Sequence, residues 1–241
     1  MQIKILYYET IDSTNEEAKR NLNFEEFTVF LAETQTSGKG RNSRTWYSPP
    51  YENLYFSFIL KPKINKKSFS CIPIIAGYSV LKTLKKIINK KIEIKWPNDI
   101  LVENKKICGI LTEVKKDTVI IGIGINVNTQ KFPEFQKNTP TSIFLETSQK
   151  HDRLKILNSF FKEFMAIYPK FLKEQKIPEN ILNDINKNLF LRDKNAIIEF
   201  KNEKISGIIE KINSDGSLNL NGKKIFAGDI IKLFHSKSNF S

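Results

Sequence analysis

Residues 92–127, IEIKWPNDILVENKKICGILTEVKKDTVIIGIGINV, carry the strongest indication of the architecture. Four apolar runs rich in β-branched residues, at 92–95, 100–102, 107–114 and 119–127, are separated by short polar turns. Strands joined by such short connections pair antiparallel, because a parallel crossover needs a dozen or more residues. The stretch therefore predicts an antiparallel meander.

Helices are predicted before and after this meander in the sequence. Residues 74–89 place apolar side chains at the spacing of a helix buried on one side, which we expect to back the sheet. A long amphipathic helix is predicted over 154–174, and a shorter one over 179–186.

The N-terminal part of the chain predicts further strands and one short helix. The first eight residues alternate like a strand, and strands are also expected at 27–32 and 54–60. Ser13 and Glu16 have the spacing of a capping box, which predicts a helix start directly after the first strand.

From Asn195 onward the pattern changes to short strands. Turns are predicted at 202–203 and 214–216, and Asn221-Gly222 is a strong hairpin signal. This tail predicts a small barrel of about fifty residues.

The predicted fold class is α+β. A mixed, largely antiparallel sheet backed by helices is expected in a catalytic domain of residues 1–188, and a small β domain in residues 189–241. The length of 241 residues and the 40% hydrophobic content suffice for a substantial core.

Composition disfavours several classes of protein. No apolar stretch is long enough to span a membrane, so a soluble, cytoplasmic protein is expected. Cys71 and Cys108 form no CxxC pair, so the sequence predicts reduced, packed thiols and neither a disulfide framework nor a zinc site. His151 and His235 are expected on the solvent-exposed surface.

The formal charge of +13 is compatible with nucleic acid, an anionic substrate or an acidic protein partner. The lysines are scattered through every segment alongside many Asn and Ile, which is more typical of a compositional bias than of one basic face. The charge therefore gives little support to nucleic-acid binding.

A long polar loop is predicted over residues 33–50, and loops of this length in compact domains are usually lids or binding loops. Its segment 38–46, GKGRNSRTW, combines three cations with two glycines, which suits the wrapping of an anion. A solvated surface loop is the alternative. The segment is not a P-loop, because Lys39 is followed by Gly40 where Ser or Thr is required.

Three further segments suggest chemistry. KWPND at 95–99 is also ordinary turn chemistry, and in KKICGIL at 105–111 a lysine enters an otherwise apolar strand. GIGIN at 122–126 lacks the third glycine and the following helix of a dinucleotide site. Its glycines are instead expected to let a ligand or neighbouring backbone approach closely.

Taken together and in this order, these segments resemble the biotin–protein ligase family. The resemblance extends over about residues 7–127 and implies a class II synthetase-like catalytic domain followed by an SH3-like β-barrel. The matching motifs are Ser13-Thr14-Asn15, the 38–46 loop, KWPND at 95–99, KxxGIL at 106–111 and GxGIN at 122–126, with further likeness at 140–143 and 227–229.

The resemblance implies a role for each matching residue. Ser13, Thr14 and Gln35 are expected to hydrogen-bond biotin, and Gly109 to lie close to its bicyclic ring. Loop residues 39–41 are expected to cover biotin and the adenylate phosphate, and Trp46 and Asn126 to hold the adenine and ATP side. The implied substrate-binding set is Ser13, Thr14, Asn15, Gln35, Gly38, Lys39, Gly40, Arg41, Arg44, Trp46, Asn98, Lys106, Gly109 and Asn126.

Three residues are expected to act in catalysis. Lys106 matches the lysine that meets the biotin carboxylate and then the phosphate, and Arg41 adds a second fixed cation. Such cations reduce the repulsion between carboxylate and triphosphate. Asp99 is the candidate that orients the amine of the acceptor lysine.

The implied activity is formation of biotinyl-5'-AMP from biotin and ATP, with release of pyrophosphate, followed by transfer of biotin to one lysine. The acceptor is expected to be the biotin carboxyl carrier protein of a biotin-dependent carboxylase, such as acetyl-CoA carboxylase. Magnesium is expected on the ATP phosphates, although the sequence shows no carboxylate cage and we assign no metal ligands. We expect a monomer or weak homodimer. DNA binding is not expected, because the catalytic pattern begins within ten residues of Met1.

The loop departs from the family pattern at two places. Lys39 replaces the more usual arginine, and Asn42-Ser43 stands where Arg-Gly is common, which suggests a looser grip on the adenylate. A pseudoenzyme that binds biotin without transferring it is therefore one alternative. A second alternative is a lipoate or octanoate ligase, although the GKGR loop and KWPND favour biotin. A third is a non-enzymatic basic nucleic-acid-binding protein.

Overall fold

A computed structural model describes residues 3–134, 139–200 and 203–231 of the chain. Its larger sheet has seven strands in the order β1-β2-β3-β7-β6-β5-β4, of which only β1 and β2 pair in parallel. The predicted mixed, largely antiparallel sheet is therefore confirmed. The strands are β1 (Lys4–Ile11), β2 (Thr28–Gln35), β3 (Leu54–Leu60), β4 (Ile92–Lys95), β5 (Asp99–Val102), β6 (Lys105–Lys115) and β7 (Thr118–Ile125).

The segment 92–127 forms the four adjacent strands β4 to β7, as its pattern predicts. Strand β6 begins at Lys105, two residues before the predicted start, so Lys106 lies within the sheet. The register between β5 and β6 shifts between Ile100 and Leu101. Such a bulge re-aims the neighbouring side chains, and here it lies beside Lys106.

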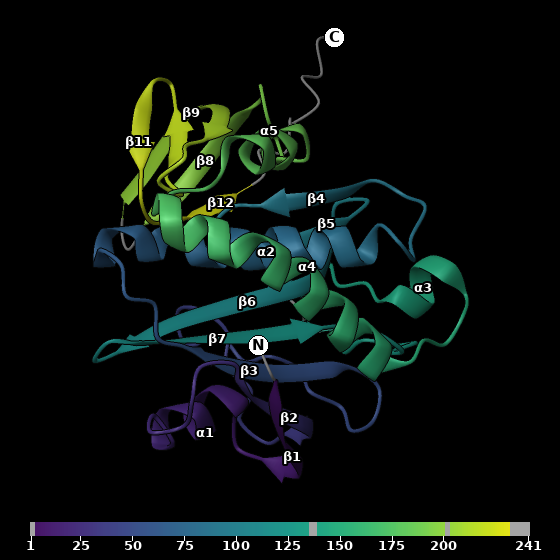
Figure 1. The fold of residues 1–241 in the computed structure, drawn as a ribbon. Coiled ribbons are helices and arrows are strands. Elements are labelled where there is room, and N and C mark those ends of the chain that lie inside the picture. Colours follow the sequence, from purple (N-terminus) through teal and green to yellow (C-terminus); the bar gives the residue numbers. More distant parts are fainter. Residues whose placement is uncertain (1–2, 135–138, 201–202, 232–241) are drawn as a thin grey trace, which may run out of the picture.

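Helices cover both faces of this sheet (Figure 1). Helices α2 and α4 pack against each other and against one face. Helix α1 packs on the other face, where its Ala18 belongs to a small apolar cluster with the buried residues Phe30, Ile59 and Ile120. The helices are α1 (Thr14–Arg20), the 3-10 helix η1 (Lys66–Ser70), α2 (Cys71–Leu84), α3 (Ile143–Thr147), α4 (Arg153–Glu174) and α5 (Glu179–Lys187).

Helix α2 differs from its prediction in two ways. It starts at Cys71, before the predicted residue 74, because a proline such as Pro73 is tolerated in the first turn of a helix. It ends at Leu84, before the predicted residue 89, because residues 85–87 form a turn. It is also buried on almost all sides, and not on one side as predicted. The C-terminal sheet covers the start of α2, where Ser70 donates a hydrogen bond to the carbonyl of Asp215 at 2.7 Å.

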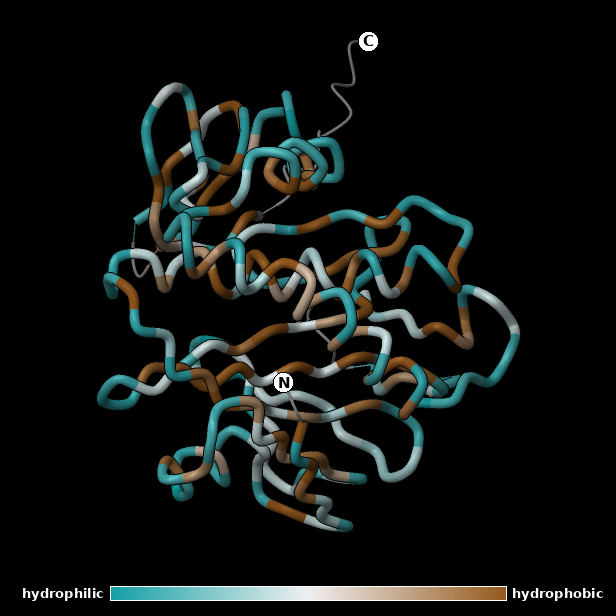
Figure 2. The backbone as a smooth tube through the Cα atoms, viewed as in Figure 1, coloured by the Kyte–Doolittle hydropathy of each residue, from teal (hydrophilic) through white to brown (hydrophobic). Residues whose placement is uncertain are grey.

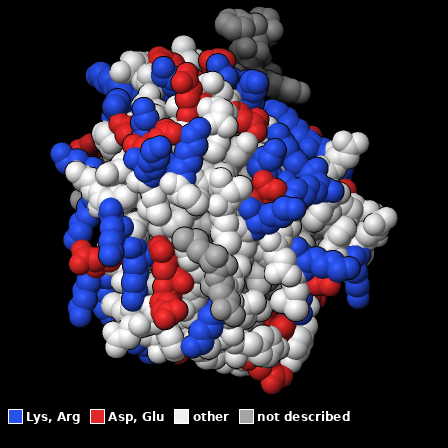
Figure 3. All heavy atoms as spheres, viewed as in Figure 1, with Lys and Arg blue, Asp and Glu red and all other residues white. Residues whose placement is uncertain are grey.

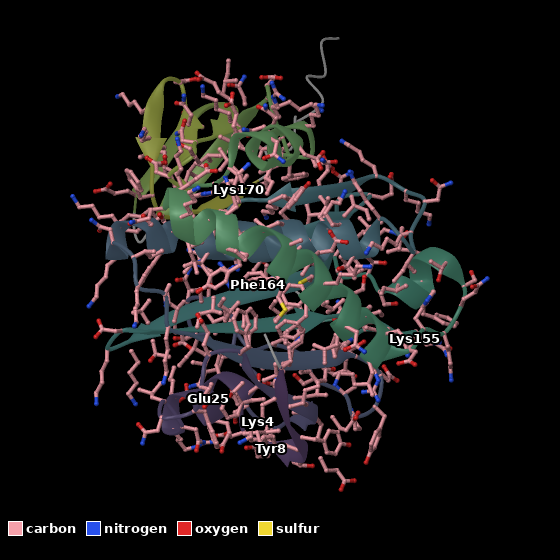
Figure 4. The ribbon with its side chains drawn as sticks, in the orientation of Figure 1. Lys4, Tyr8, Glu25, Lys155, Phe164 and Lys170 are labelled. Carbon is pink, nitrogen blue, oxygen red and sulfur yellow. The ribbon has the colours of Figure 1, made fainter. Side chains whose placement is uncertain are left out.

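Aromatic rings fill the space between α4 and the sheet. Phe164, labelled in Figure 4, has its ring centroid 5.3 Å from that of Phe58 on β3, and Phe160 lies 5.4 Å from Phe56. Each such pair contributes about 0.5–1.5 kcal/mol beyond the area that it buries. Figure 2 shows the same layering, with hydrophobic residues between the layers and hydrophilic ones on the outer loops.

A second, antiparallel sheet forms the C-terminal part, in the order β11-β10-β9-β8-β12. The predicted Asn221-Gly222 hairpin is confirmed, since both residues have the positive φ angles, 48° and 75°, that a type I′ turn requires. Of the turn predicted at 202–203, Asn202 lies outside the described ranges and Glu203 is the first residue of β9. The strands are β8 (Asn195–Phe200), β9 (Glu203–Ile212), β10 (Leu218–Leu220), β11 (Lys223–Ile225) and β12 (Asp229–Ile231).

The two sheets share one hydrophobic core. Buried residues of β8, β9, β10 and β12 belong to the same cluster as those of α2 and α4. Trp96, which is 1% exposed, donates from Nε1 to the carbonyl of Gly216 at 3.0 Å across the junction. The second sheet fits the predicted SH3-like domain, while the boundary between residues 188 and 189 stays a prediction.

Cys71 and Cys108 are buried free thiols, as predicted. His151 is wrongly predicted as a solvent-exposed surface residue, because it is half-buried. Its backbone N–H donates a hydrogen bond to Oδ1 of Asn128, and its carbonyl accepts one from Nδ2 of the same residue. His235 lies outside the described residues.

Within the described part of the chain, no helix is both long and apolar enough to cross a bilayer. Figure 3 shows Lys and Arg distributed over the visible face with Asp and Glu among them.

Candidate functional site

A cleft opens where α1 begins, between the 38–46 loop and strands β6 and β7. Eleven of the fourteen predicted substrate-binding residues line it. The segments that carry them come from widely separated parts of the chain, so the fold brings the predicted motifs together. The lining residues are Ser13, Thr14, Asn15, Gln35, Lys39, Gly40, Arg41, Trp46, Asn98, Lys106, Gly109, Ile110, Leu111, Gly122, Ile123 and Gly124.

The start of α1 is held by buried hydrogen bonds. Thr14 donates its backbone N–H to Oε1 of Gln35 at 2.9 Å, which fixes the end of β2 against α1. Asn15 donates to Glu113 at 2.8 Å and to the carbonyl of Leu111 at 3.3 Å. Ser57, on β3, donates to Oδ1 of Asn15 at 2.6 Å. This wall of the cleft is therefore rigid before any ligand arrives.

The predicted capping box is wrong. Ser13 occupies the N-cap position with extended backbone, but its side chain makes no capping hydrogen bond. Glu16 instead accepts hydrogen bonds from Lys39 at 2.6 Å and Lys19 at 2.9 Å, and these bonds lower its pKa. The Ser13 hydroxyl thus stays available at the cleft, and Lys39 is tied to α1.

The predicted polar loop is shorter and more ordered than its sequence indicates. Residues 33–35 belong to β2, and Lys39 and Thr45 form a β-bridge that makes 38–46 a small hairpin. At its tip Asn42 and Ser43 have φ angles of 53° and 58°. A left-handed conformation costs a non-glycine residue roughly 1–2 kcal/mol. Ser43 therefore occupies a conformation that glycine adopts without this cost.

Trp46 lies flat on the sheet because two glycines leave room for its ring. A β-carbon on Gly124 would lie 2.5 Å from Cε2 and Nε1 of Trp46, and one on Gly109 would lie 2.8 Å from Cζ3. The Lys106 ammonium is 5.2 Å from the ring centroid, a cation–π contact. The indole Nε1 is buried and has no hydrogen-bond partner within the described residues.

Cations and carboxylates meet at the other wall of the cleft. Lys106 Nζ lies 2.7 Å from Oδ1 of Asp99. Arg41 donates to Asn98 at 3.1 Å and pairs with Asp229 at 2.8 Å. Lys95, paired with Asp99 in the β4–β5 register, is half-buried, and burial lowers the pKa of its ammonium although Asp99 acts in the opposite direction. The site is positively charged on balance, which suits an anionic ligand.

Three of the predicted binding residues do not line the cleft. Gly38 supports the hairpin, since a β-carbon there would lie 2.7 Å from the Trp46 carbonyl oxygen. Arg44 pairs with Asp229 at 2.9 Å. Asn126 is buried and donates to the carbonyl of Thr141 at 2.9 Å, which ties the end of β7 to the segment before α3. Its role on the ATP side stays a prediction.

Besides five motif residues that line the cleft, namely Ile110, Leu111, Gly122, Ile123 and Gly124, two polar residues around the site were not predicted. Ser57 is the single polar residue in the buried β3 sequence LYFSFIL, and this interruption was its signal. Asp229 comes from the C-terminal sheet, and its only signal was the likeness of residues 227–229 to the family. Asp99 lies just behind the lining residues and contacts the cleft through Lys106.

The described residues include no group of three or more His, Cys, Asp or Glu side chains placed to hold a metal ion. Asp99 and Asp229 are each engaged by cations. Neither of these two carboxylates is therefore free to act as a metal ligand in this arrangement of side chains.

Comparison with known proteins agrees with this site. Residues 7–128 match the sequence profile of the biotin/lipoate A/B protein ligase family. The bifunctional ligase/repressor BirA of Bacillus subtilis is 34% identical over 187 residues, which are 74% of this chain and 58% of that protein. The chain thus spans under two thirds of that relative's length. A biotin–[acetyl-CoA-carboxylase] ligase of Mycobacterium tuberculosis is 30% identical over 57% of this chain and 53% of its own.

The fold has equally clear relatives. The biotin protein ligase from Aquifex aeolicus, solved in complex with biotin and ATP, superposes with a TM-score of 0.83 and 30% identity. The superposition covers 95% of this chain and 97% of that chain, so it includes both sheets. By sequence profile, curated relatives and fold alike, this chain belongs to the biotin/lipoate A/B protein ligase family.

Proposed function

We propose that the chain is a biotin–protein ligase, which forms biotinyl-5'-AMP from biotin and ATP and then biotinylates a carrier lysine. The observation that carries the proposal is the convergence of all five motifs on one cleft with Lys106 in its wall. The names of the relatives support biotin as the acid and acetyl-CoA carboxylase as the source of the carrier domain.

Biotin is proposed to lie along α1 and the glycines of β6 and β7. Ser13 and Thr14 would hydrogen-bond its polar ring atoms with Gln35, while Asn15 keeps this wall in place. Gly109 lies under the Trp46 ring and beside the end of the Lys106 side chain, so the biotin ring is proposed to lie next to these two side chains at that strand position. The apolar body of a small acid with a few fixed polar contacts matches the usual character of such pockets.

In the first half-reaction, a biotin carboxylate oxygen attacks the α-phosphorus of ATP, and the bond to the pyrophosphate oxygen breaks. Both groups are anionic, so fixed cations lower the barrier by reducing their repulsion. Lys106 is proposed to leave Asp99 for the carboxylate and then the phosphate. Arg41 and Lys39 are proposed to close the loop over the adenylate. Trp46 and Asn126 remain the candidates for the adenine side.

In the second half-reaction, the neutral amine of the carrier lysine attacks the carbonyl carbon of the adenylate, and AMP leaves. Deprotonating a lysine with an ordinary pKa costs roughly 4–5 kcal/mol at pH 7. Asp99, which lies 2.7 Å from Lys106, is proposed to orient that amine once Lys106 has turned to the ligand. Magnesium would enter with the nucleotide phosphates.

Three further expectations belong to this proposal. The protein is proposed to act in the cytoplasm, as a monomer or weak homodimer, without binding DNA.

Lipoate or octanoate is the rival acid, since the family includes lipoate ligases. The identity of the transferred acid is therefore what the test must decide.

The test is mass spectrometry of a biotin carboxyl carrier domain incubated with the protein, magnesium-ATP and equimolar biotin and lipoate. A biotin adduct is expected, and Lys106→Ala should slow its formation by about a hundred-fold or more, as removal of a transition-state charge partner does. Lys105→Ala is the matched control, because this neighbour on β6 does not line the cleft and its ammonium lies 3.8 Å from Glu146 instead. A lipoyl adduct alone would replace the proposed substrate, and no adduct would favour a binding role.

A further inference from the structure

In its described part, the C-terminal sheet reaches the candidate site through one side chain, Asp229 at the start of β12. Its Oδ1 lies 2.8 Å from Nη1 of Arg41, and its Oδ2 lies 2.9 Å from Nη2 of Arg44. Asn42 also approaches Oδ2, at 3.4 Å. One carboxylate thus holds both arginines and the tip of the 38–46 hairpin, across 185 or more positions of sequence.

The backbone places this carboxylate with little freedom. Gly228 has a φ of 137°, and a β-carbon on it would lie 2.5 Å from Cγ2 of Ile198. The Gly228 carbonyl itself accepts a hydrogen bond from Arg41 at 3.3 Å. Ile230, the next residue along β12, is 2% exposed in the shared core. Asp229 is therefore anchored on both sides, whereas the hairpin that it holds lies at the surface.

Arg41 is held through only one of its guanidinium nitrogens among the described residues. The contacts of Arg41 with Asn98, Gly228 and Asp229 all use Nη1, so its Nε and Nη2 have no partner within the described residues. Arg41 also lines the cleft. A guanidinium gripped along one edge keeps its other N–H groups directed at a second anion, and the fork geometry of arginine suits a phosphate there.

We propose that Asp229 is a positioning residue that holds the 38–46 hairpin, and with it Arg41, in place for the phosphates of the nucleotide. The C-terminal sheet thereby becomes part of the nucleotide site without touching the reacting atoms. Ordering a surface loop in advance removes a cost that ligand binding would otherwise carry. The kinetic consequence of this inference rests on the proposed function, but the structural consequence does not.

The structural arm measures trypsin cleavage after Arg41 and Arg44 in the ligand-free protein, with the cut sites identified by mass spectrometry. Cleavage of a folded loop requires local opening, so its rate reports how firmly the hairpin is held. Asp229→Asn should be cut about five-fold faster at these two sites, which corresponds to about 1 kcal/mol.

Two variants control this arm. Glu199→Gln removes the carboxylate directly opposite Asp229 on β8, whose lysine partner is 3.8 Å away and exposed, and should leave the cleavage rate unchanged. Asp229→Glu keeps the charge and should remain closer to the parent than Asp229→Asn. Equal cleavage of parent and Asp229→Asn would overturn the inference, as would equal acceleration in Glu199→Gln.

The kinetic arm follows pyrophosphate release with biotin saturating. Asp229→Asn should raise the KM for ATP about five-fold and change kcat less than two-fold, since it alters preorganisation and not the reacting groups. Faster cleavage with an unchanged KM would show that the hairpin contact does not serve the nucleotide, and would overturn the positioning role. If the parent releases no pyrophosphate, the proposed function fails, while the trypsin arm still decides whether Asp229 holds the hairpin.

Discussion

Replacing Gly122 with alanine should damage the wall of the cleft from within the sheet. Gly122 lies on β7 under the side chain of Asn15, and a β-carbon there would be 2.0 Å from Oδ1 and 2.8 Å from Cγ of Asn15. Ordinary contact begins near 3.4 Å, so the amide would have to withdraw by about 1.4 Å. Neither strand can yield easily, because Gly122 is paired with Leu111 on one side and Ser57 on the other.

The cost follows from the hydrogen bonds of Asn15. Its bonds to Ser57 at 2.6 Å and Glu113 at 2.8 Å cannot both survive such a displacement. Leaving one or two buried polar groups unsatisfied costs about 1–3 kcal/mol each, so we expect a loss of about 3 kcal/mol in the free energy of unfolding. The shift of Asn15 also moves Thr14, so affinity for biotin should fall as well.

Urea unfolding followed by circular dichroism measures this loss, which should lower the midpoint by about 1 M at a typical m-value. Gly77→Ala is the control. A β-carbon in the interior of α2 would meet Ile100 and Ile110 at an ordinary 3.5 Å, and alanine should stabilise the helix by about 0.5–1 kcal/mol. A Gly122→Ala protein within about 0.5 kcal/mol of the parent would contradict the close approach described for Asn15.

Two further predictions concern buried titratable groups. Burial lowers the pKa of Lys95, so its charge destabilises the folded state at neutral pH, and this penalty disappears as the pH rises from the folded pKa to the unfolded one. Lys95→Met should therefore raise the unfolding midpoint at pH 7 and lose that advantage near pH 10.5; a less stable variant at pH 7 would contradict this. Burial raises the pKa of the Cys71 thiol to about 12 and that of Cys108 still higher, so both should react with an aromatic disulfide reagent at pH 8 at least about a hundred-fold more slowly than in urea. Rapid release of the coloured thiolate from the native protein would show that the thiols are accessible.

The sheet could be predicted because its decisive signals are local. Each strand of 92–127 is a β-branched run, and each turn is short enough to force antiparallel pairing. The Asn221-Gly222 hairpin is local in the same way. The parallel pairing of β1 with β2 gave no such signal, because it depends on how α1, which connects the two strands, packs across β2, β3 and β7.

Errors arose where distant contacts override local preference. The sequence places Ser13 and Glu16 at capping distance, but Lys39 and Lys19 offer Glu16 charged partners that the backbone N–H cannot match. Helix α2 was predicted to be buried on one side only. Its own sequence carries no sign that the turn at 214–216 covers its start through hydrogen bonds with Ser70 and Cys71.

The candidate site shows the same division. Its motif residues could be named from sequence since the chemistry concentrates them in short segments. Asp229 could not be paired with Arg41 and Arg44, because that contact spans almost the whole chain and depends on how the two sheets meet. Ser57 shows only as a polar residue in an apolar strand until Asn15 is placed beside it.

The positions of the two tryptophans give the protein a pair of separate optical probes. Trp46 lies on Gly109 and Gly124 beside a lysine ammonium, with its indole N–H unpaired among the described residues, so its emission will respond to whatever occupies the cleft. Trp96 is enclosed and bonded to Gly216, so its emission will respond to separation of the two sheets. With Trp46 replaced by phenylalanine, the remaining signal follows the junction alone, and with Trp96 replaced it follows the cleft alone.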